Sequence, residues 1–411
     1  MSSTVRTVES AKEVPRWRKI LLSAFLIALV GTTLELGSSW YLKRFEGYDG
    51  THLLQYEFDP YKNIHLTPNY VNTVGIHHNG QGFRYPTEVE RKKPAGTYRI
   101  FLMGGSAAYG LGGAWPHIQR DYAVLRDSET ISAHLERYLR QSLPARNVEV
   151  INAAITSDWT HHHLIYLNQA ILNYQPDMVL FLDGFNDFFF FDESHDQFAS
   201  YAYQERARVI MGEPTLYSLA YANAWWLFRK SAFANAAMRA LHNVRLRLLR
   251  APPGAPPIDV EKAMAGLHQV FPRSALAMDR RIGLILRDAG VTAVFMLQPL
   301  LILERDQKPM PPIEGALFEF DVRSYPPGYE ALIHAAVPYI REQEEKMARD
   351  VGAQFIDLTR VYAGVPQQAY TDYCHLTPLG NEIVARHIGE RLLPLISAIP
   401  VDGSAPDARG G

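Results

Sequence analysis

Four polar residues, spread over most of the chain, are of the types that acyl-transfer chemistry requires. They are Ser106, Asn186, Asp372 and His375. A serine hydroxyl becomes a nucleophile when a histidine accepts its proton and a carboxylate orients that histidine. An amide side chain can donate a hydrogen bond to the oxyanion that forms on attack. For these groups to act together, the fold must bring all four to one place.

Ser106 follows two glycines that end the apolar run at residues 100–103. Consecutive apolar residues of this kind predict a strand in the middle of a parallel sheet. Gly104 and Gly105 allow a sharp turn after it. Open α/β sheets bind ligands beyond the carboxyl ends of their strands, so Ser106 is expected beside a ligand crevice. Taken alone, the stretch also fits an ordinary turn whose serine has no catalytic role.

Asp372 and His375 lie three residues apart, just before a predicted helix at residues 378–396. Pro378 suits the first turn of that helix. In a turn, this spacing lets the carboxylate reach the imidazole and fix its tautomer, while the other ring nitrogen takes the serine proton. By itself the pair is a weak signal, because an aspartate that caps a turn beside a surface histidine has the same spacing.

Asn186 lies in the segment 184–187, which follows the apolar run 178–183. Gly184 frees the turn, and the amide of Asn186 can donate to an oxyanion. The loop after the run 148–152 can offer a backbone N–H to the same oxyanion. Asparagine is common in turns, so this signal is also weak alone. Together, however, three strand ends and one late loop each deliver a different catalytic part to one edge of a sheet.

Strand and helix patterns alternate from residue 98 onward, which favours an α/β fold with a doubly wound, flavodoxin-like, mainly parallel five-stranded sheet and helices on both faces. Right-handed crossovers are expected between the strands. The predicted strands cover residues 99–103, 148–152, 178–183, 291–298 and 354–358, and the predicted helices cover 128–141, 160–173, 275–288, 329–350 and 378–396.

In these motifs the chain resembles the SGNH or GDSL-like hydrolase superfamily. Residues 104–106 resemble its first block, residues 184–187 match its G-x-N-D block, and residues 372–375 match its D-x-x-H block. The resemblance covers roughly residues 79–396, apart from a long insertion. It implies a triad of Ser106, Asp372 and His375, an oxyanion hole formed by the N–H groups of Ser106 and Ser157 with the Asn186 amide, and supporting turns at Gly105, Gly184 and Asp187.

The chain departs from the family pattern at Ser157, where the second block usually carries a glycine whose N–H completes the oxyanion hole. A backbone donor does not strictly need glycine. The resemblance therefore does not determine the geometry of this loop, nor the reaction rate that depends on it.

Composition narrows the classes of function. The chain has 411 residues with a formal net charge of −2, which does not favour nucleic acid as a partner. Its single cysteine, Cys374, excludes an intrachain disulfide and a multi-cysteine metal site. The consecutive histidines 161–163 would not face one metal ion from a helix. We therefore expect no metal and no cofactor.

Residues 20–42 form an apolar run preceded by three basic residues at positions 16, 18 and 19. The run can span a bilayer as a signal-anchor helix if Glu35 lies near the far interface. The basic cluster would keep the N-terminus in the cytoplasm and export the rest. A cleaved signal peptide and a buried helix of a soluble protein are the alternatives.

The organisation expected from these patterns is a cytoplasmic tail at 1–19, the transmembrane helix at 20–42, an irregular lead-in at 43–97, the hydrolase domain at 98–397 and a flexible tail at 398–411. The domain is interrupted by an insertion at about 188–271 with an apolar helical part at 216–249. That insertion is expected to form either a lid over the site or a helical pair on the flank of the domain.

The resemblance implies a membrane-anchored serine esterase or acyltransferase in the periplasm or outside the cell, acting on O-acyl groups, especially acetyl groups, of cell-surface glycans. Possible partners are an acylated glycan and the envelope polysaccharide machinery. The alternative is a non-catalytic glycan-binding or assembly subunit of an envelope complex. The motifs do not distinguish hydrolysis from transfer, because both proceed through the same acyl-enzyme.

Overall fold

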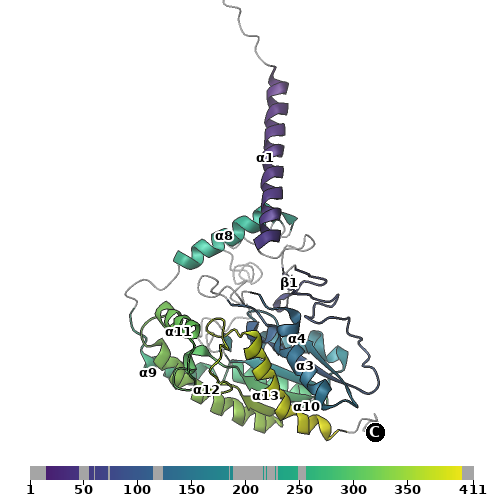
Figure 1. Ribbon diagram of the computed structural model, residues 1–411, viewed down its shortest axis with the longest axis vertical. Coiled ribbons are helices and arrows are strands. Elements are labelled where there is room, and N and C mark those ends of the chain that lie inside the picture. The colour runs from purple at the N-terminus through teal and green to yellow at the C-terminus, as the bar shows by residue number, and fades with distance from the viewer. Residues whose placement is uncertain are drawn as a thin grey trace, which may run out of the picture.

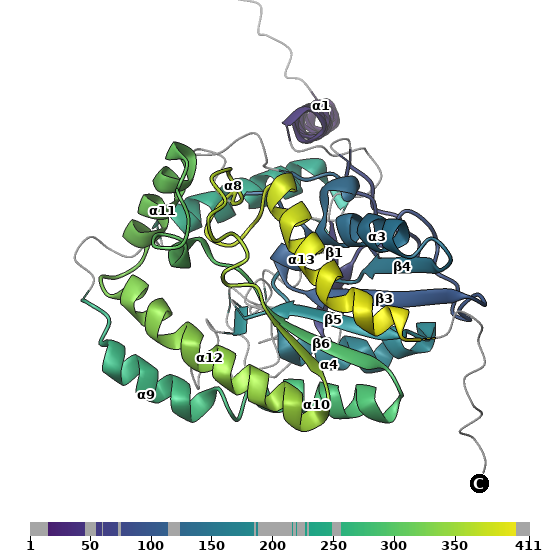
Figure 2. The same ribbon diagram turned by 60° about the horizontal axis from the view of Figure 1, so that its bottom comes forward.

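A five-stranded parallel sheet lies at the centre of the globular part of the molecule, and helices cover both of its faces (Figure 1, Figure 2). The computed structural model describes residues 15–45, 55–59, 61–72, 75–113, 124–184, 186–187, 216, 219, 227, 230–248 and 256–399. The strands of the sheet are β3 (Thr97–Gly104), β4 (Asn147–Asn152), β5 (Met178–Asp183), β6 (Thr292–Leu297) and β7 (Gln354–Asp357).

The spatial order β4–β3–β5–β6–β7 and the parallel pairing confirm the predicted doubly wound sheet. Within this sheet, β3 comes first in the chain. The chain then forms β4 on one side of β3 and returns to form β5 on the other side. This is the flavodoxin-like order. All eight residues of β3 are buried, as expected for a strand covered on both faces.

Two helices pack together on one face of the sheet, α3 (Ile131–Ser142) and α13 (Pro378–Ser397). The other face carries α4 (Thr160–Gln169), α10 (Ala275–Asp288) and α12 (Tyr329–Val351) (Figure 2). Because α3 and α4 leave the sheet on opposite faces, the strand order reverses between β3 and β5. Ligands of such sheets bind in the crevice beyond this reversal point. Ser106 follows β3 and Asn186 follows β5, so the two residues flank it.

The lead-in differs from the irregular segment that was expected. It contains a two-stranded antiparallel sheet, formed by β1 (Tyr56–Asp59) and β2 (Asn63–Leu66). Its later part packs on the domain through Phe83, whose ring contacts the rings of Phe101 and Tyr174 at centroid distances of 5.5 Å and 5.3 Å. The two strands are four residues each, too short for a clear alternation in the sequence.

Two of the predicted helices differ in their bounds, and other helices were not predicted at all. The helix predicted from residue 128 begins at Ile131, because a 3-10 turn occupies Asp127–Glu129 and the hydroxyl of Thr130 accepts the first-turn hydrogen bond. The helix predicted to reach residue 173 ends at Gln169 and continues as a 3-10 turn. Three α-helices were not predicted: the short α2 (Ser106–Tyr109), which Ser106 begins, α9 (Val260–Val270) and α11 (Pro312–Ser324).

The long helix α1 (Arg16–Phe45) projects from the domain, and α8 (Ala232–Leu248) lies across its foot (Figure 1). Within α1, the segment Arg16–Arg44 is long and apolar enough to cross a membrane, with a mean hydropathy of 2.0 and no buried part in its apolar window. A signal sequence meets the same criteria, so this finding is weak evidence for an anchor. Most of the insertion at 188–271 and the tail beyond residue 399 lie outside the described residues.

Candidate active site

Ser106, His375 and Asp372 form a continuous chain of hydrogen bonds. His375 Nε2 lies 2.8 Å from Ser106 Oγ, and His375 Nδ1 lies 2.6 Å from Asp372 Oδ2. Asp372 and His375 are buried, whereas Ser106 is half-buried and remains accessible. The structure therefore brings together the three residues that the sequence separates by up to 269 positions.

The loop that carries the histidine is shaped by the aspartate itself. Asp372 Oδ1 accepts hydrogen bonds from the N–H groups of Cys374 and His375, at 3.0 Å and 2.9 Å, which closes a tight turn. The other carboxylate oxygen then meets the imidazole. A backbone bond from Thr371 N–H to the His375 carbonyl, 2.8 Å, holds the turn from the other side. The spacing of three thus orients both the loop and the ring.

A buried ion pair, which sequence reasoning missed, supports this loop. Glu314 Oε1 accepts hydrogen bonds from the N–H groups of Ala369 and Tyr370, at 2.6 Å and 3.0 Å. Its other oxygen lies 2.7 Å from Lys308 Nζ, and both side chains are fully buried. The ammonium group also donates to the Gln367 carbonyl at 2.9 Å. No local sequence pattern marks such a pair, because its members lie far from the loop that they hold.

Two titratable groups behind the triad have raised pKa values, which favour their neutral forms. Asp321, from α11, is 1% exposed, and burial together with the charge of Asp372 raises its pKa to about 7. Burial, followed by the charge of Asp372, raises the pKa of the Cys374 thiol. Asp372, Cys374 and His375 place donor atoms within 4.8 Å of one another. With a neutral thiol and both Asp372 oxygens already hydrogen-bonded, the set suits a triad better than a metal ion.

Asn186 lies directly beside the serine turn. Its Nδ2 donates to the Asp158 carbonyl at 2.6 Å, which leaves the second N–H of the amide for another acceptor. A Cβ at position 105 would lie 2.5 Å from that nitrogen, so only glycine lets the amide approach the backbone next to Ser106. Within the described parts of the chain, the N–H groups of Ser106 and Ser157 donate to no other group. The Asn186 amide thus lies next to the Ser106 turn, and each of the three groups retains an N–H that can donate to a ligand.

Ser157 adopts the backbone conformation that a glycine would favour. Its φ is +68°, and its side chain is buried. An L-residue in this left-handed region is strained by about 1–2 kcal/mol. The serine therefore keeps the loop shape that the family pattern implies, at a cost in conformational energy.

The residues expected to support the turns are in contact with the neighbouring loops. Gly184 has a φ of +117°, and a Cβ there would lie 2.4 Å from Leu297 Cδ1. Asp187 Oδ1 accepts from the N–H and the hydroxyl of Thr160, at 3.2 Å and 2.8 Å. Because Thr160 begins α4, Asp187 ties the loop after β5 to the helix that follows the Ser157 loop.

A second buried network lies under the Ser157 loop, and sequence reasoning missed it as well. Lys62, on the lead-in, is 2% exposed and donates to the Ile64 carbonyl at 2.5 Å. Burial raises the pKa of Asp158 to about 7, and the charge of Lys62 opposes that shift. Burial lowers the pKa of Lys62, and the charges of Asp158 and Asp59 oppose that shift. The lead-in thus places a buried lysine close enough to Asp158 for their charges to interact.

The three consecutive histidines, in the first turn of α4, are buried. His163 Nδ1 lies 3.2 Å from Asp183 Oδ2. Burial alone would lower the pKa of His163, but the charge and hydrogen bond of Asp183 outweigh it and raise that pKa to about 9. The carboxylate partner gives this histidine a structural role.

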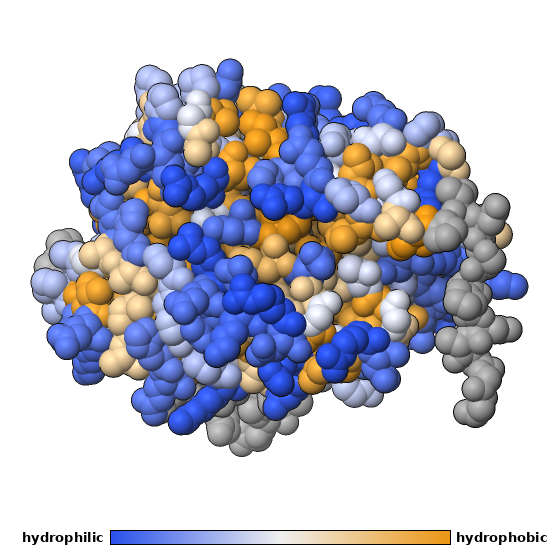
Figure 3. Space-filling model, turned by 90° about the horizontal axis from the view of Figure 1, so that it is seen from below, coloured by the Kyte–Doolittle hydropathy of each residue, from blue (hydrophilic) through white to orange (hydrophobic). Residues whose placement is uncertain are grey.

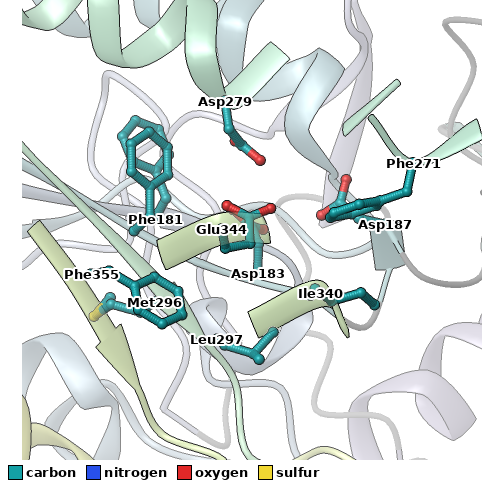
Figure 4. Close-up of a pocket in the computed structure, with 12 residues that line it drawn as sticks. Phe181, Asp183, Asp187, Phe271, Asp279, Met296, Leu297, Ile340, Glu344 and Phe355 are labelled. Carbon is teal, nitrogen blue, oxygen red and sulfur yellow. The ribbon is translucent and has the colours of Figure 1, made fainter. Parts of the chain in front are cut away.

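A small cavity of about 20 Å³ lies at the carboxyl end of β5, where Asp183, Gly184 and Asp187 form part of its lining (Figure 4). The carboxyl groups of Asp279 and Glu344 point toward one another in it. Burial raises the pKa of both, that of Glu344 to about 8, so the pair holds a proton at neutral pH. It contacts none of the three triad residues and offers no group to the chemistry there.

No protein-family model matches the chain, and no curated protein matches it. Among solved structures, it is similar to a catalytic mutant of Axe2, an acetylxylan esterase from Geobacillus stearothermophilus, at 12% identity over 76% of this chain and 99% of that chain, with a TM-score of 0.37. It is similar to a protein described as a GDSL-like lipase from Parabacteroides merdae at 13% identity over 74% and 97% of the two chains, with a TM-score of 0.37.

The acetyl xylan esterase AlAXEase aligns at 11% identity over 72% of this chain and 99% of that chain, with a TM-score of 0.34. One of these structures is described as GDSL-like, the name of the superfamily that the motif blocks resemble. Their identities and TM-scores are too low to carry an argument about what this chain does, which has to rest on the geometry of the site.

Proposed function

We propose that this chain is a serine esterase of SGNH type, in which Ser106 is the nucleophile, His375 the general base and Asp372 the group that orients the histidine. The observation that carries the proposal is the hydrogen-bond chain from Ser106 Oγ to His375 Nε2, 2.8 Å, and from His375 Nδ1 to Asp372 Oδ2, 2.6 Å. Such a chain lies within the range over which a base accepts the proton of a nucleophile.

In the proposed reaction, His375 Nε2 takes the hydroxyl proton as Ser106 Oγ attacks the ester carbonyl carbon. The bond to the alcohol oxygen then breaks, and His375 returns the proton to that oxygen, which leaves an acyl-enzyme on Ser106. Water, deprotonated by the same histidine, releases the acid. A sugar hydroxyl in place of water would make the second step a transfer.

The oxyanion of each tetrahedral intermediate would accept hydrogen bonds from the N–H groups of Ser106 and Ser157 and from the Asn186 amide. Support comes from the position of Asn186 over Gly105 and from the left-handed conformation of Ser157. Removing one oxyanion donor typically lowers kcat by about 10²–10³-fold.

The proposed substrates are O-acyl esters, with acetyl groups of cell-surface glycans as the favoured class, and the proposed location is the outer side of the plasma membrane with α1 as an uncleaved anchor. The substrate class rests on the motifs and the anchor layout that the chain shares with envelope members of the resembled superfamily. The orientation rests on the basic residues that precede the apolar part of α1.

Hydrolysis of a small soluble ester, p-nitrophenyl acetate, by the purified full-length chain in detergent tests the activity. Ser106→Ala should lower the rate to that of the buffer, because the nucleophile is lost. Ser142→Ala, at an exposed serine of α3, is the matched control and should keep the wild-type rate. Equal rates in Ser106→Ala and wild type would contradict the proposal and favour the non-catalytic alternative.

A further inference from the structure

Glu35, inside the long apolar helix α1, binds the first turn of α8. Its carboxylate accepts hydrogen bonds from the Ser231 hydroxyl at 2.7 Å and from the N–H groups of Ala232 and Phe233 at 2.5 Å and 3.1 Å. The first N–H groups of a helix have no partners within the helix, so a carboxylate there both satisfies them and favours the positive end of the helix dipole. Glu35 thus fixes where α8 begins relative to α1.

The contact lies where the apolar core of a bilayer would end. A helix rises about 1.5 Å per residue, and a hydrocarbon core of about 30 Å takes about 20 residues. Counted from Trp17, which follows the first basic residue, that length ends close to Glu35. On α1, the less exposed residues after this point are Ser38, Ser39 and Leu42, which share one helical face with Glu35. The last turns of α1 therefore pack on protein, whereas the earlier ones are exposed.

The outer face of α8 is apolar. Phe233 and Leu241 are 43% and 59% exposed, and Ala237 and Ala240 between them are exposed as well. Spacings of four, seven and eight residues place all four on one side of the helix. The residues toward the protein, Ala232 and Asn235, are buried. We call the first four the outer stripe of α8; its apolar side chains face away from the domain.

The charge of α8 suits a negatively charged surface. Its sequence contains three arginines and no aspartate or glutamate. Three more exposed apolar residues, Leu216, Leu219 and Leu227, precede it among the described residues of the insertion. The face of the domain opposite α1 differs, because apolar residues there are interspersed with many hydrophilic ones (Figure 3). An exposed apolar stripe on a basic helix is typical of a helix that lies in the plane of a membrane interface.

We propose that α8 is a second membrane contact, an in-plane helix whose outer stripe enters the outer surface of an anionic phospholipid bilayer while Glu35 joins it to the spanning helix. The inference rests on the proposed membrane anchoring by α1. It adds that the domain is held at two places, so that the position of the Ser106 site relative to the membrane is set by the protein rather than by a flexible stalk.

Depth-dependent quenching of a fluorescent label tests this in the full-length chain, reconstituted into vesicles of phosphatidylethanolamine and phosphatidylglycerol. A nitrobenzoxadiazole label is attached to Leu241→Cys on the outer stripe, or to Arg239→Cys on another side of the same helix as the matched control. Leu29→Cys, in the apolar part of α1, reports the anchor. Cys374 is buried, and the chain without an added cysteine gives the labelling blank.

Lipids with a doxyl group near the headgroup should quench the label at position 241 at least threefold more than the label at 239. Lipids with a doxyl group deep in the chain should quench the label at position 29. Quenching at 29 with equal, weak quenching at 241 and 239 would overturn the α8 proposal and leave the anchor intact. An unquenched label at 29 would overturn both, whereas p-nitrophenyl acetate hydrolysis by the same samples reports the esterase proposal separately.

Discussion

On the base side of the candidate site, the turn that carries Asp372 and His375 is closed by hydrogen bonds between residues two to four positions apart. On the oxyanion side, Ser157 is held in a left-handed conformation, and the charge of Asp158 interacts with that of Lys62, a residue nearly a hundred positions earlier in the chain. The base-side turn is therefore closed by its own residues, and the Lys308–Glu314 pair holds only the segment that leads into it. The oxyanion side depends on the lead-in as well.

This difference suggests which perturbations each side tolerates. A substitution that keeps the hydrogen-bond acceptors of the base-side turn should preserve the fold and lower only the catalytic rate. A change in the network under the oxyanion side should lower stability and activity together, because a buried charge loses its partner.

The largest effect is expected for Asp372→Asn. The amide oxygen can still accept the two backbone N–H groups that close the turn, but the side chain no longer stabilises an imidazolium. We expect kcat on p-nitrophenyl acetate to fall about 10³–10⁴-fold, with the free energy of unfolding changed by less than about 1 kcal/mol. Asp372→Ala, which also removes the acceptors, should lose stability as well. A less than tenfold fall in kcat for Asp372→Asn would contradict the triad.

Lys62→Met tests the oxyanion side. It removes one of the two cations, Lys62 and His163, whose charges favour the ionised form of the buried Asp158 carboxyl. This should lower the free energy of unfolding by up to about 3 kcal/mol and reduce kcat. Loss of the cation raises the pKa of Asp158 further, so urea unfolding should show a greater loss at pH 8 than at pH 6. The double variant Lys62→Met/Asp158→Asn should recover most of the stability. No recovery would mean that Lys62 acts through packing alone.

Asp321→Asn tests the group behind the base side by its pH dependence. The carboxyl has a pKa of about 7 in the fold, above its ordinary value near 4. The bound proton therefore stabilises the wild type at low pH, and this contribution is lost as the pH rises through about 7. Asparagine cannot ionise. The free energy of unfolding of the variant should therefore rise relative to that of the wild type by on the order of 2 kcal/mol between pH 5 and pH 8. Parallel stability profiles for the two proteins would refute this assignment.

The smallest effect is expected for Ser157→Gly. Glycine relieves the left-handed strain but gives the unfolded chain more freedom, so the free energy of unfolding should change by less than about 1 kcal/mol. Because the loop already has the glycine-type conformation, the rate of ester hydrolysis should stay within about threefold of wild type. A tenfold or greater gain would show that the serine distorts the oxyanion hole.

The features of the fold that were predictable from sequence are those with a local cause. The five strands were recognisable as apolar runs, such as residues 100–103 and 178–183, which end at glycines. The chain order of the Ser106, Asn186 and His375 segments suggested one sheet edge. In the structure, His375 Nε2 lies 2.8 Å from Ser106 Oγ, and the Asn186 amide lies beside Gly105.

What could not be predicted depends on partners far apart in sequence. Lys308 and Glu314 are close in the chain, but their importance comes from Ala369 and Tyr370, which they support. In the sequence, Lys62 cannot be distinguished from an exposed lysine, because its burial depends on how the lead-in packs on the domain. The strands β1 and β2 are too short to show a period, and α9 and α11 lie in proline-rich surroundings that masked their helical pattern.

The central claim is that Ser106 is a nucleophile activated by His375, and covalent labelling tests it most directly. The full-length chain is treated with a fluorophosphonate, and the modified residue is identified by peptide mass spectrometry. The account predicts one adduct, on Ser106, whose rate of formation falls at least a hundredfold in His375→Gln and is unchanged in Ser142→Ala. An unmodified Ser106, or labelling at the same rate in His375→Gln, would contradict it.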